Sequence, residues 1–318
     1  MVYGEPMQTS KGQNPIALRF DKNAVALFDR RNGTKLRFAL GKYEKASKPE
    51  LVDIKVSDFC SMNCSFCYQG STIFGEHSTP ENIDFIVAEL AKAKVFEVAI
   101  GGGEPLETPH IVDTFRKFHE AGIVPNFTTK FPGLVRKLWP QIGHLIGGFA
   151  YSAETPAQIR SSAKLFGKGK IPMSKVNLHY VMGLGGRDHF KEYLMAAEEV
   201  GMRVTLLGYK TSGRGKDVIP FPYGWWIDVL DELIALGKCP SLSIDTPLAE
   251  AYADELPVDS THFHVLEGAY SMYIDAVSME MGASSFDEKE ELVPFDAGWR
   301  KRYRQRSFAK GQWGDRLK

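Results

Sequence analysis

The stretch from residue 51 to residue 70, LVDIKVSDFCSMNCSFCYQG, decides how the rest of the chain is interpreted. Its first half alternates apolar and polar residues, which predicts a strand over residues 52–57. Its second half places three of the four cysteines of the chain, Cys60, Cys64 and Cys67, within eight positions. A strand that leads directly into a polar loop with three thiols predicts a functional site at the end of that strand.

From this strand to about residue 240, strand-like and helix-like stretches alternate about six times. The later predicted strands are FEVAIGG, VPNFTT, IGGFAYSA, KVNLHYVM and RVTLLGY. Such alternation predicts a parallel sheet, because parallel neighbours need a helical crossover. We therefore expect an α/β fold, a partial (β/α)6 TIM-like barrel over residues 51–240, with its chemistry at the C-terminal ends of the strands.

The two flanking regions are predicted to be smaller. Residues 1–50 contain three short alternating runs with an Asn-Gly hairpin signal at Asn32, which predicts a small N-terminal β-meander. Residues 241–318 form a mixed C-terminal extension, in which SLSID, FHVL and SMYIDAV are strand-like and are expected to extend or cover the sheet.

Composition limits the possible classes of protein. The chain has 318 residues, of which 43% are hydrophobic and 25% charged, and its formal net charge is zero. These values are typical of a globular protein and argue against a generally basic protein that coats nucleic acid. We find no apolar signal core at the start and no run of about 18 apolar residues. A cytoplasmic protein without membrane contact is therefore expected.

Three interpretations of the clustered thiols remain open from the residues alone. A structural zinc site needs four ligands, usually from two C-x2-C pairs, and only Cys239 is left to serve as the fourth. Buried thiols gathered by coincidence fit poorly with a polar loop. A [4Fe–4S] cluster held by three thiolates would leave one iron free to bind a small molecule.

Two motifs resemble those of the radical SAM superfamily. The pattern C-x3-C-x-Phe-C follows the first barrel strand, with Phe66 in the family's aromatic position. Gly102-Gly103-Glu104-Pro105 closes the second strand, as does the family's GGE-P motif, which binds the methionyl amino group of S-adenosylmethionine (SAM). The resemblance covers about residues 51–240. It implies one [4Fe–4S] cluster, SAM, and an external low-potential electron donor of the flavodoxin or ferredoxin type.

The resemblance also assigns roles to residues at the strand ends. It implies that Cys60, Cys64 and Cys67 are the cluster ligands. It implies SAM contacts for Phe66, Gly102, Gly103, Glu104, Ser152, Glu154, Leu207 and Tyr209. Two of these roles are physically plausible without the resemblance, because Glu104 is an anion suited to an ammonium group and glycine lets backbone approach a ligand closely.

The activity that the resemblance implies is reductive cleavage of SAM and removal of a hydrogen atom from an organic substrate. The outcome would be rearrangement, epimerisation or another radical modification. Only Cys239 remains after three cluster ligands, so a second cluster is not expected. The alternative is an iron–sulfur or zinc sensor, a regulatory module without turnover, which would have no need of the SAM motifs.

Polar residues on the barrel strands predict a substrate pocket, because a barrel interior without a ligand prefers branched apolar side chains. The candidates are Asn126, Thr128, Lys130, Asn177, His179 and Lys210. Alternatively, these side chains are simply solvated. Cys239 is a candidate hydrogen-atom donor, although most free cysteines are small buried apolar residues.

The last twenty residues, 299–318, are basic, with aromatic residues interleaved. Basic and aromatic side chains together are typical of nucleic-acid contact. The alternatives are a solvated tail or a helix that pairs with the acidic segment before it, residues 287–296. The candidate substrates are therefore a modified base in nucleic acid, a peptide, or an amino-acid-like small molecule.

Overall fold

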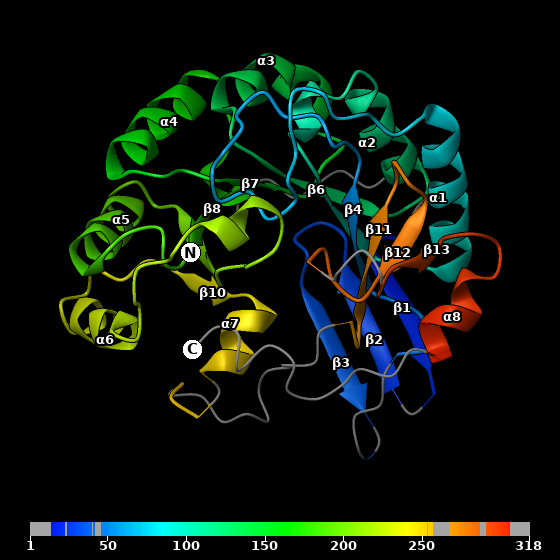
Figure 1. Ribbon diagram of the computed structural model, residues 1–318. Helices are drawn as coiled ribbons and strands as arrows, with labels where there is room; N and C mark the ends of the chain where they lie inside the picture. The colour runs from blue at the N-terminus through cyan, green and yellow to red at the C-terminus, as the bar shows by residue number, and fades with distance from the viewer. Residues whose placement is uncertain are drawn as a thin grey trace.

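The computed structural model describes residues 14–22, 24–39, 41, 46–252, 254–256, 268–286 and 291–305. The predicted strand FHVL at residues 263–266 and the part of the basic tail beyond residue 305 lie outside these ranges. Figure 1 shows helices α1 to α6 in an arc around the outside of a curved sheet, with a small separate sheet beside it.

The six predicted strand–helix units are confirmed. Their strands β4 to β9 are neighbours in chain order and all run parallel. The units are β4 Leu51–Lys55 with α1 Pro80–Ala93, β5 Glu97–Gly101 with α2 Ile111–Glu120, β6 Val124–Thr129 with α3 Pro132–Ile142, β7 Phe149–Tyr151 with α4 Pro156–Lys168, β8 Val176–Val181 with α5 Arg187–Glu199, and β9 Arg203–Leu207 with α6 Trp226–Ala235.

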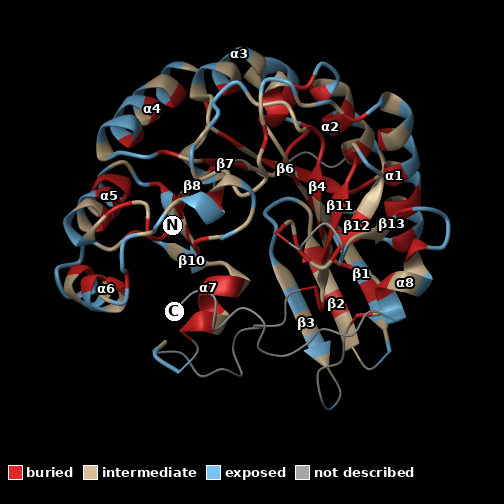
Figure 2. Cartoon of the chain, in the orientation of Figure 1, coloured by how far each residue is buried: buried red, intermediate tan, exposed pale blue. Residues whose placement is uncertain are grey.

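Local sequence explains where these elements begin and which face they bury. Thr155 caps α4 and exchanges hydrogen bonds with Gln158, and Pro156 occupies the first turn. On β4, Val52 and Ile54 are buried in the core between the sheet and the helices, so Asp53 between them faces the inside of the barrel. Figure 2 shows buried residues along the strands and the exposed ones mainly on the outer sides of the helices.

The C-terminal extension lengthens the sheet at both edges. Strand β10 (Leu242–Ile244), which is followed by α7 (Thr246–Ala251), pairs parallel with β9, and β11 (Ser271–Asp275) pairs parallel with β4. Strands β12 (Glu280–Gly282) and β13 (Val293–Pro294) then add antiparallel to β11. In the described part of the chain β10 and β11 do not pair with each other, so the barrel is open, as predicted.

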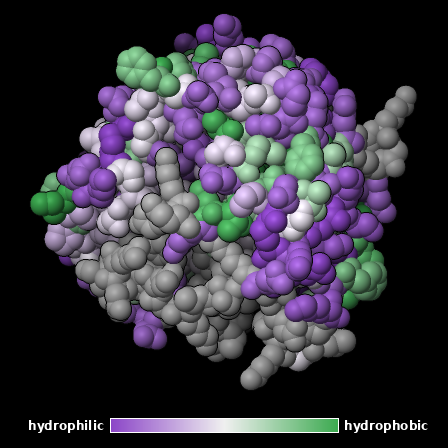
Figure 3. All heavy atoms as spheres, turned by 45° about the vertical axis from the view of Figure 1, so that its right-hand side comes forward, coloured by the Kyte–Doolittle hydropathy of each residue, from purple (hydrophilic) through white to green (hydrophobic). Residues whose placement is uncertain are grey.

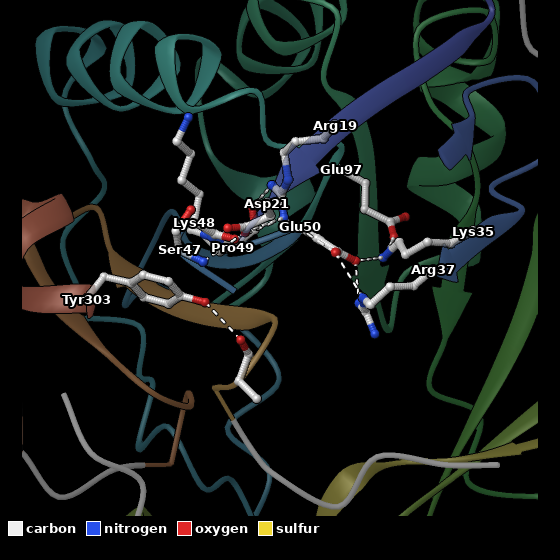
Figure 4. A network of polar contacts seen from close by, with 11 residues as sticks. Arg19, Asp21, Lys35, Arg37, Ser47, Lys48, Pro49, Glu50, Glu97 and Tyr303 are labelled. Carbon is white, nitrogen blue, oxygen red and sulfur yellow. Dashed lines mark hydrogen bonds and ion pairs between the residues drawn. The ribbon is translucent and has the colours of Figure 1, made fainter. Parts of the chain in front are cut away.

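The N-terminal meander is also confirmed, as an antiparallel sheet of β1 (Ile16–Asp21), β2 (Ala24–Asp29) and β3 (Lys35–Ala39). Its inner face is fixed to the barrel by charge. The Glu50 carboxylate lies 2.6 Å from Arg37 Nη2 and 3.4 Å from Arg19 Nη2. Figure 4 shows Glu50 between these two arginines. The buried Arg19 guanidinium also donates to two backbone carbonyls just before Glu50.

The start of the basic tail forms helix α8 (Trp299–Gln305) rather than a free segment. Trp299 and Tyr303 are buried and donate hydrogen bonds to Glu89 and to the Ala269 carbonyl. These two buried rings are not available to stack on bases, and nucleic-acid contact by the rest of the tail stays a prediction. Arg302 pairs with Asp296, as expected of a helix that pairs with the acidic segment.

The surface of the described residues gives no sign of a membrane segment. None of the helices among them is both long and apolar enough to span a bilayer. The face in Figure 3 is largely hydrophilic, with a smaller group of hydrophobic residues near its middle. Among the described residues, the exposed large apolar side chains include Ile16, Leu18 and Phe20 on β1 and Leu36 and Phe38 on β3.

Candidate functional site

The three clustered thiols lie where the sequence predicts them, at the C-terminal end of β4. They belong to a loop of residues 59–72, which we call the cysteine loop. Phe59 and Thr72 form a β-bridge at its base, and the Cys60 N–H donates to the Thr72 carbonyl at 2.9 Å. The three thiols are free and half-buried. A closed base and reachable sulfurs suit a loop that holds a ligand.

The paired glycines after β5 press against the base of the cysteine loop. A Cβ at Gly103 would lie 1.9 Å from the Phe59 carbonyl oxygen, and a Cβ at Gly102 would lie 2.5 Å from the Ser57 carbonyl oxygen. Gly102 also has a φ of +120°, which disfavours other residues. The sequence predicts that these glycines let backbone approach a ligand. The structure gives a different reason for these glycines: their backbone lies too close to the backbone of Ser57 and Phe59 to leave room for a side chain.

The Glu104 side chain is buried, with 2% of its surface exposed. Its carboxylate accepts hydrogen bonds from Thr129 Oγ1 at 2.7 Å, from Lys130 N at 3.0 Å and from Leu106 N at 3.1 Å. Burial raises the pKa of Glu104 to about 7, although these hydrogen bonds oppose the shift. A carboxylate has about four acceptor positions, so one is left for a ligand.

The Lys130 side chain lies beside the cysteine loop, on the predicted SAM side of the site. Its ammonium forms an ion pair with Glu154 and lies 4.8 Å from the centre of the Phe66 ring. Burial lowers the pKa of Lys130, but Glu154 and the nearby Cys64 outweigh it and raise the pKa above its usual value. Ser152 comes close to this group because its N–H donates to the end of β6.

Residues at and just after the end of β9 form contacts within the protein. The Leu207 carbonyl accepts a hydrogen bond from Met182 N at 2.8 Å. The Tyr209 side chain is buried, and its hydroxyl donates to the Gly215 carbonyl at 2.8 Å. Lys210 pairs with Asp245 at 3.0 Å. The Tyr209 side chain therefore supports the chain that follows it.

Two of the predicted pocket residues are occupied by internal hydrogen bonds. Asn126 Nδ2 donates to Glu97 at 3.3 Å. Asn177 Nδ2 donates to Thr205 Oγ1 at 2.6 Å, and that hydroxyl is 2.7 Å from Ser243 Oγ. Polar groups that satisfy one another in this way can be structural, because a buried polar group needs a partner with or without a substrate.

Asp53, Thr128 and His179 differ from those residues. None of the described residues forms a hydrogen bond with their side chains. Burial raises the pKa of Asp53 to about 6, against the pull of the Lys210 charge. Burial, reinforced by Lys210, lowers the pKa of His179 to about 4. Asp53 is not among the residues that the sequence predicts for the pocket, although its position between Val52 and Ile54 signals an inward carboxylate.

The structure does not bring Cys239 to this site. Cys239 comes just before β10, which runs parallel to β9, whereas the cysteine loop comes just after β4. It therefore lies at the N-terminal end of the parallel strands, whereas the cysteine loop lies at their C-terminal end. Burial and the charge of Glu198 raise the pKa of Cys239. This position gives no support to a role as hydrogen-atom donor or as fourth ligand to zinc.

The residues around the cysteine loop suit an iron–sulfur cluster better than a single ion. Among the described residues, no three His, Cys, Asp or Glu side chains converge closely enough to hold one metal ion. In a cluster each iron takes its own thiolate, so such convergence is not needed. The Nη2 atom of Arg214 is buried without a hydrogen-bond partner, and the other nitrogens of this guanidinium bind the cysteine loop. A cationic donor in this position suits anionic sulfur.

A family model confirms the resemblance drawn from the motifs. The model described as radical SAM superfamily matches residues 54–138, from β4 into α3, and includes the cysteine loop and Glu104. A search of curated proteins gave no match.

Solved structures with the same fold include two proteins. SuiB of Streptococcus suis bound to S-adenosylmethionine is 14% identical, with 96% of this chain and 89% of that one covered and a TM-score of 0.68. SuiB bound to the precursor peptide SuiA is 15% identical, with 94% and 88% covered and the same TM-score. anSMEcpe with bound AdoMet and the Cp18Cys peptide is 13% identical, with 85% and 82% covered and a TM-score of 0.55.

Proposed function

Because this chain belongs to the radical SAM superfamily, we propose that it is an enzyme that binds one [4Fe–4S] cluster through Cys60, Cys64 and Cys67, with SAM beside it. The observation that carries the proposal is the closed loop of three reachable thiols at the end of β4, against the Gly-Gly-Glu turn of β5. When bound, the cluster supplies the electron that cleaves SAM to methionine and a 5′-deoxyadenosyl radical, which removes a hydrogen atom from the substrate.

The protein's own residues hold SAM and shield it. Glu104 keeps one acceptor position for the SAM ammonium while its other positions bind β6 and the turn. The ion pair of Lys130 with Glu154 and the ring of Phe66 form the neighbouring wall, with Ser152 beside it. Glu104 itself is buried, so its charge attracts the ammonium more strongly than in solution.

A peptide is the substrate class that we favour. SuiB and anSMEcpe, which share this fold, are each bound to a peptide in a solved structure. Burial of Trp299 and Tyr303 removes two of the aromatic rings that a nucleic-acid substrate would use. Rearrangement, epimerisation and other radical modifications are all compatible with a single cluster, and Cys239 is not positioned to complete an epimerisation.

Within the barrel we place the substrate contacts at Asp53, Thr128 and His179. Their side chains face the inside of the sheet and have no hydrogen-bond partner among the described residues. Asn126 and Asn177, in contrast, are already bonded. A polar group without a partner gains most from a ligand, because burying it alone is costly.

Asp53 and His179 are expected to make stability depend on pH in opposite directions. The folded pKa of Asp53, about 6, is above the unfolded value of 3.8, so the folded state holds the extra proton and stability falls as pH rises from about 4 to about 6. The folded pKa of His179, about 4, is below 6.5, so stability falls as pH drops from about 6.5 to about 4.

Asp53→Asn should therefore be more stable than the wild type above pH 7, by up to about 3 kcal/mol, since one pKa unit corresponds to about 1.4 kcal/mol. His179→Gln should lose the acid sensitivity. Urea unfolding between pH 4 and pH 8 measures both, with the exposed Asp231→Asn as control. Equal pH profiles for Asp53→Asn and Asp231→Asn would show that Asp53 is solvated and not part of a closed pocket.

Release of 5′-deoxyadenosine tests the proposed function directly. Anaerobically reconstituted protein, reduced with dithionite and given SAM alone, should release 5′-deoxyadenosine slowly. Addition of the true substrate should accelerate this release. A protein that carries a cluster but releases none under these conditions is a sensor or regulatory module instead.

A further inference from the structure

The chain that follows β9 lies on the cysteine loop. We call residues 209–217 the Arg214 segment; it ends in the short 3-10 helix η3 (Gly213–Asp217). The Arg214 N–H donates to the Cys67 carbonyl at 2.9 Å, and Arg214 Nε donates to the Cys64 carbonyl at 2.9 Å. Arg214 Nη1 donates to the Ser71 carbonyl, also at 2.9 Å. One residue thus holds the backbone of two of the three clustered cysteines.

Glycines make this contact possible. Gly213 has a φ of +53°, and a Cβ there would lie 2.3 Å from the Tyr68 carbonyl oxygen. A Cβ at Gly215 would lie 2.4 Å from the Lys210 carbonyl oxygen. In the sequence the stretch GYKTSGRGK suggests a mobile loop or a plain connector. Its glycines instead allow close packing, and the Tyr209 hydroxyl holds the segment in place through its hydrogen bond to the Gly215 carbonyl.

The remaining nitrogen of the guanidinium has no role in this packing. Arg214 Nη2 is buried and has no hydrogen-bond partner. Native proteins seldom leave a buried donor unpaired, because such a donor has lost its hydrogen bond to water and gained none from the protein. The guanidinium is also always cationic and is held beside cysteines that bear negative charge when they bind iron.

We propose that Arg214 is a positioning residue for the cluster: it fixes the carbonyls of Cys64 and Cys67 and donates its free Nη2 hydrogen to a sulfur of the bound cluster. This inference rests on the proposed function. A hydrogen bond and a positive charge at the sulfurs stabilise the reduced form, which carries more negative charge. They therefore raise the reduction potential of the cluster.

Three variants of Arg214 distinguish its effect on the backbone of the cysteine loop from its effect on the reduction potential of the cluster. Arg214→Gln removes the charge and the planar set of guanidinium N–H donors. Arg214→Lys keeps the charge but not this set of donors, and Arg214→Ala removes both together with the side-chain bulk. Arg30→Gln is the matched control, because Arg30 also donates to two backbone carbonyls, at Gly122 and Asn14, in the N-terminal sheet. All four are reconstituted anaerobically as the full chain.

The measurements are iron and sulfide per chain, the rate of iron loss to a chelator, and the midpoint potential from EPR-monitored titration. Arg214→Gln should lose iron about 10–100-fold faster, as is typical when an outer partner of a metal ligand is removed. Its midpoint potential should be more negative than that of the wild type, and Arg214→Lys should lie between them. Arg30→Gln should match the wild type in both.

The outcomes distinguish this inference from the proposed function. If the wild type takes up no iron and sulfide, the proposed function fails and this inference fails with it. If the wild type carries a cluster but Arg214→Gln keeps the same potential and the same rate of iron loss, only the role of Arg214 is overturned. Should the melting temperature show that Arg214→Gln and Arg214→Ala do not fold, an unchanged potential in folded Arg214→Lys overturns it equally.

Discussion

Cys64→Ala should release no more 5′-deoxyadenosine from SAM than a reaction without protein. The variant loses one of three thiolates, so the cluster has only two protein ligands. Removing an outer partner of a metal ligand typically costs about 10–100-fold in affinity, and removing the ligand itself should cost more. Iron and sulfide content after anaerobic reconstitution, together with chromatographic measurement of 5′-deoxyadenosine, checks the prediction.

Cys239→Ala is the control for this experiment, because it also removes a thiol, but at the N-terminal end of the parallel strands and not in the cysteine loop. It should keep the iron content and the release rate of the wild type. If Cys64→Ala keeps the iron content and the release rate of the wild type, the proposal that three thiols hold a cluster is wrong. Purification of a colourless protein with one zinc per chain on these thiols would instead support the zinc interpretation.

Glu104→Ala should destabilise the fold by about 3–5 kcal/mol, because it leaves three donors without an acceptor in a buried place. The donors are Thr129 Oγ1 and the N–H groups of Leu106 and Lys130. Glu104→Gln keeps the size and one oxygen but turns an amide toward one donor, so it should cost about 1–2 kcal/mol. Urea unfolding of the protein without cluster measures both losses.

The same pair of variants separates support of the fold from binding of SAM. Glu104→Gln folds but lacks the anion, so its affinity for SAM in equilibrium dialysis should fall about tenfold, which corresponds to about 1.4 kcal/mol. The exposed Glu192→Gln should change neither quantity. A Glu104→Ala variant as stable as the wild type would show that water replaces the carboxylate and that the bonds at this turn are not required.

The order of the elements follows from local signals. Alternation of strand-like and helix-like stretches predicts the parallel sheet, because each period is set by the residues of one element and needs no distant contact. The cysteine spacing and the Gly-Gly-Glu turn are equally local, since both lie within a few residues of a strand end. The six strand–helix units and the position of the three thiols after the first of their strands were therefore predictable.

The roles of residues that depend on a partner far away in the sequence were not predictable. Lys130 and Asn126 occupy the same strand face, yet Lys130 pairs with Glu154 beside the cysteine loop and Asn126 binds Glu97. Trp299 looks like an exposed aromatic of a basic tail, but it is buried against Glu89, more than two hundred residues earlier. Such partners are fixed only when the chain has folded.

By itself, then, the sequence determined the kind of fold, the edge of the sheet where chemistry is concentrated, and the three thiols that could hold iron. The tertiary structure alone decided that the Arg214 segment holds the cysteine loop, that Glu104 supports the fold, and that Cys239 is remote from the site. The reason is physical. Periodicity and spacing act along the chain, whereas burial and hydrogen bonding depend on which strand end meets which loop in space.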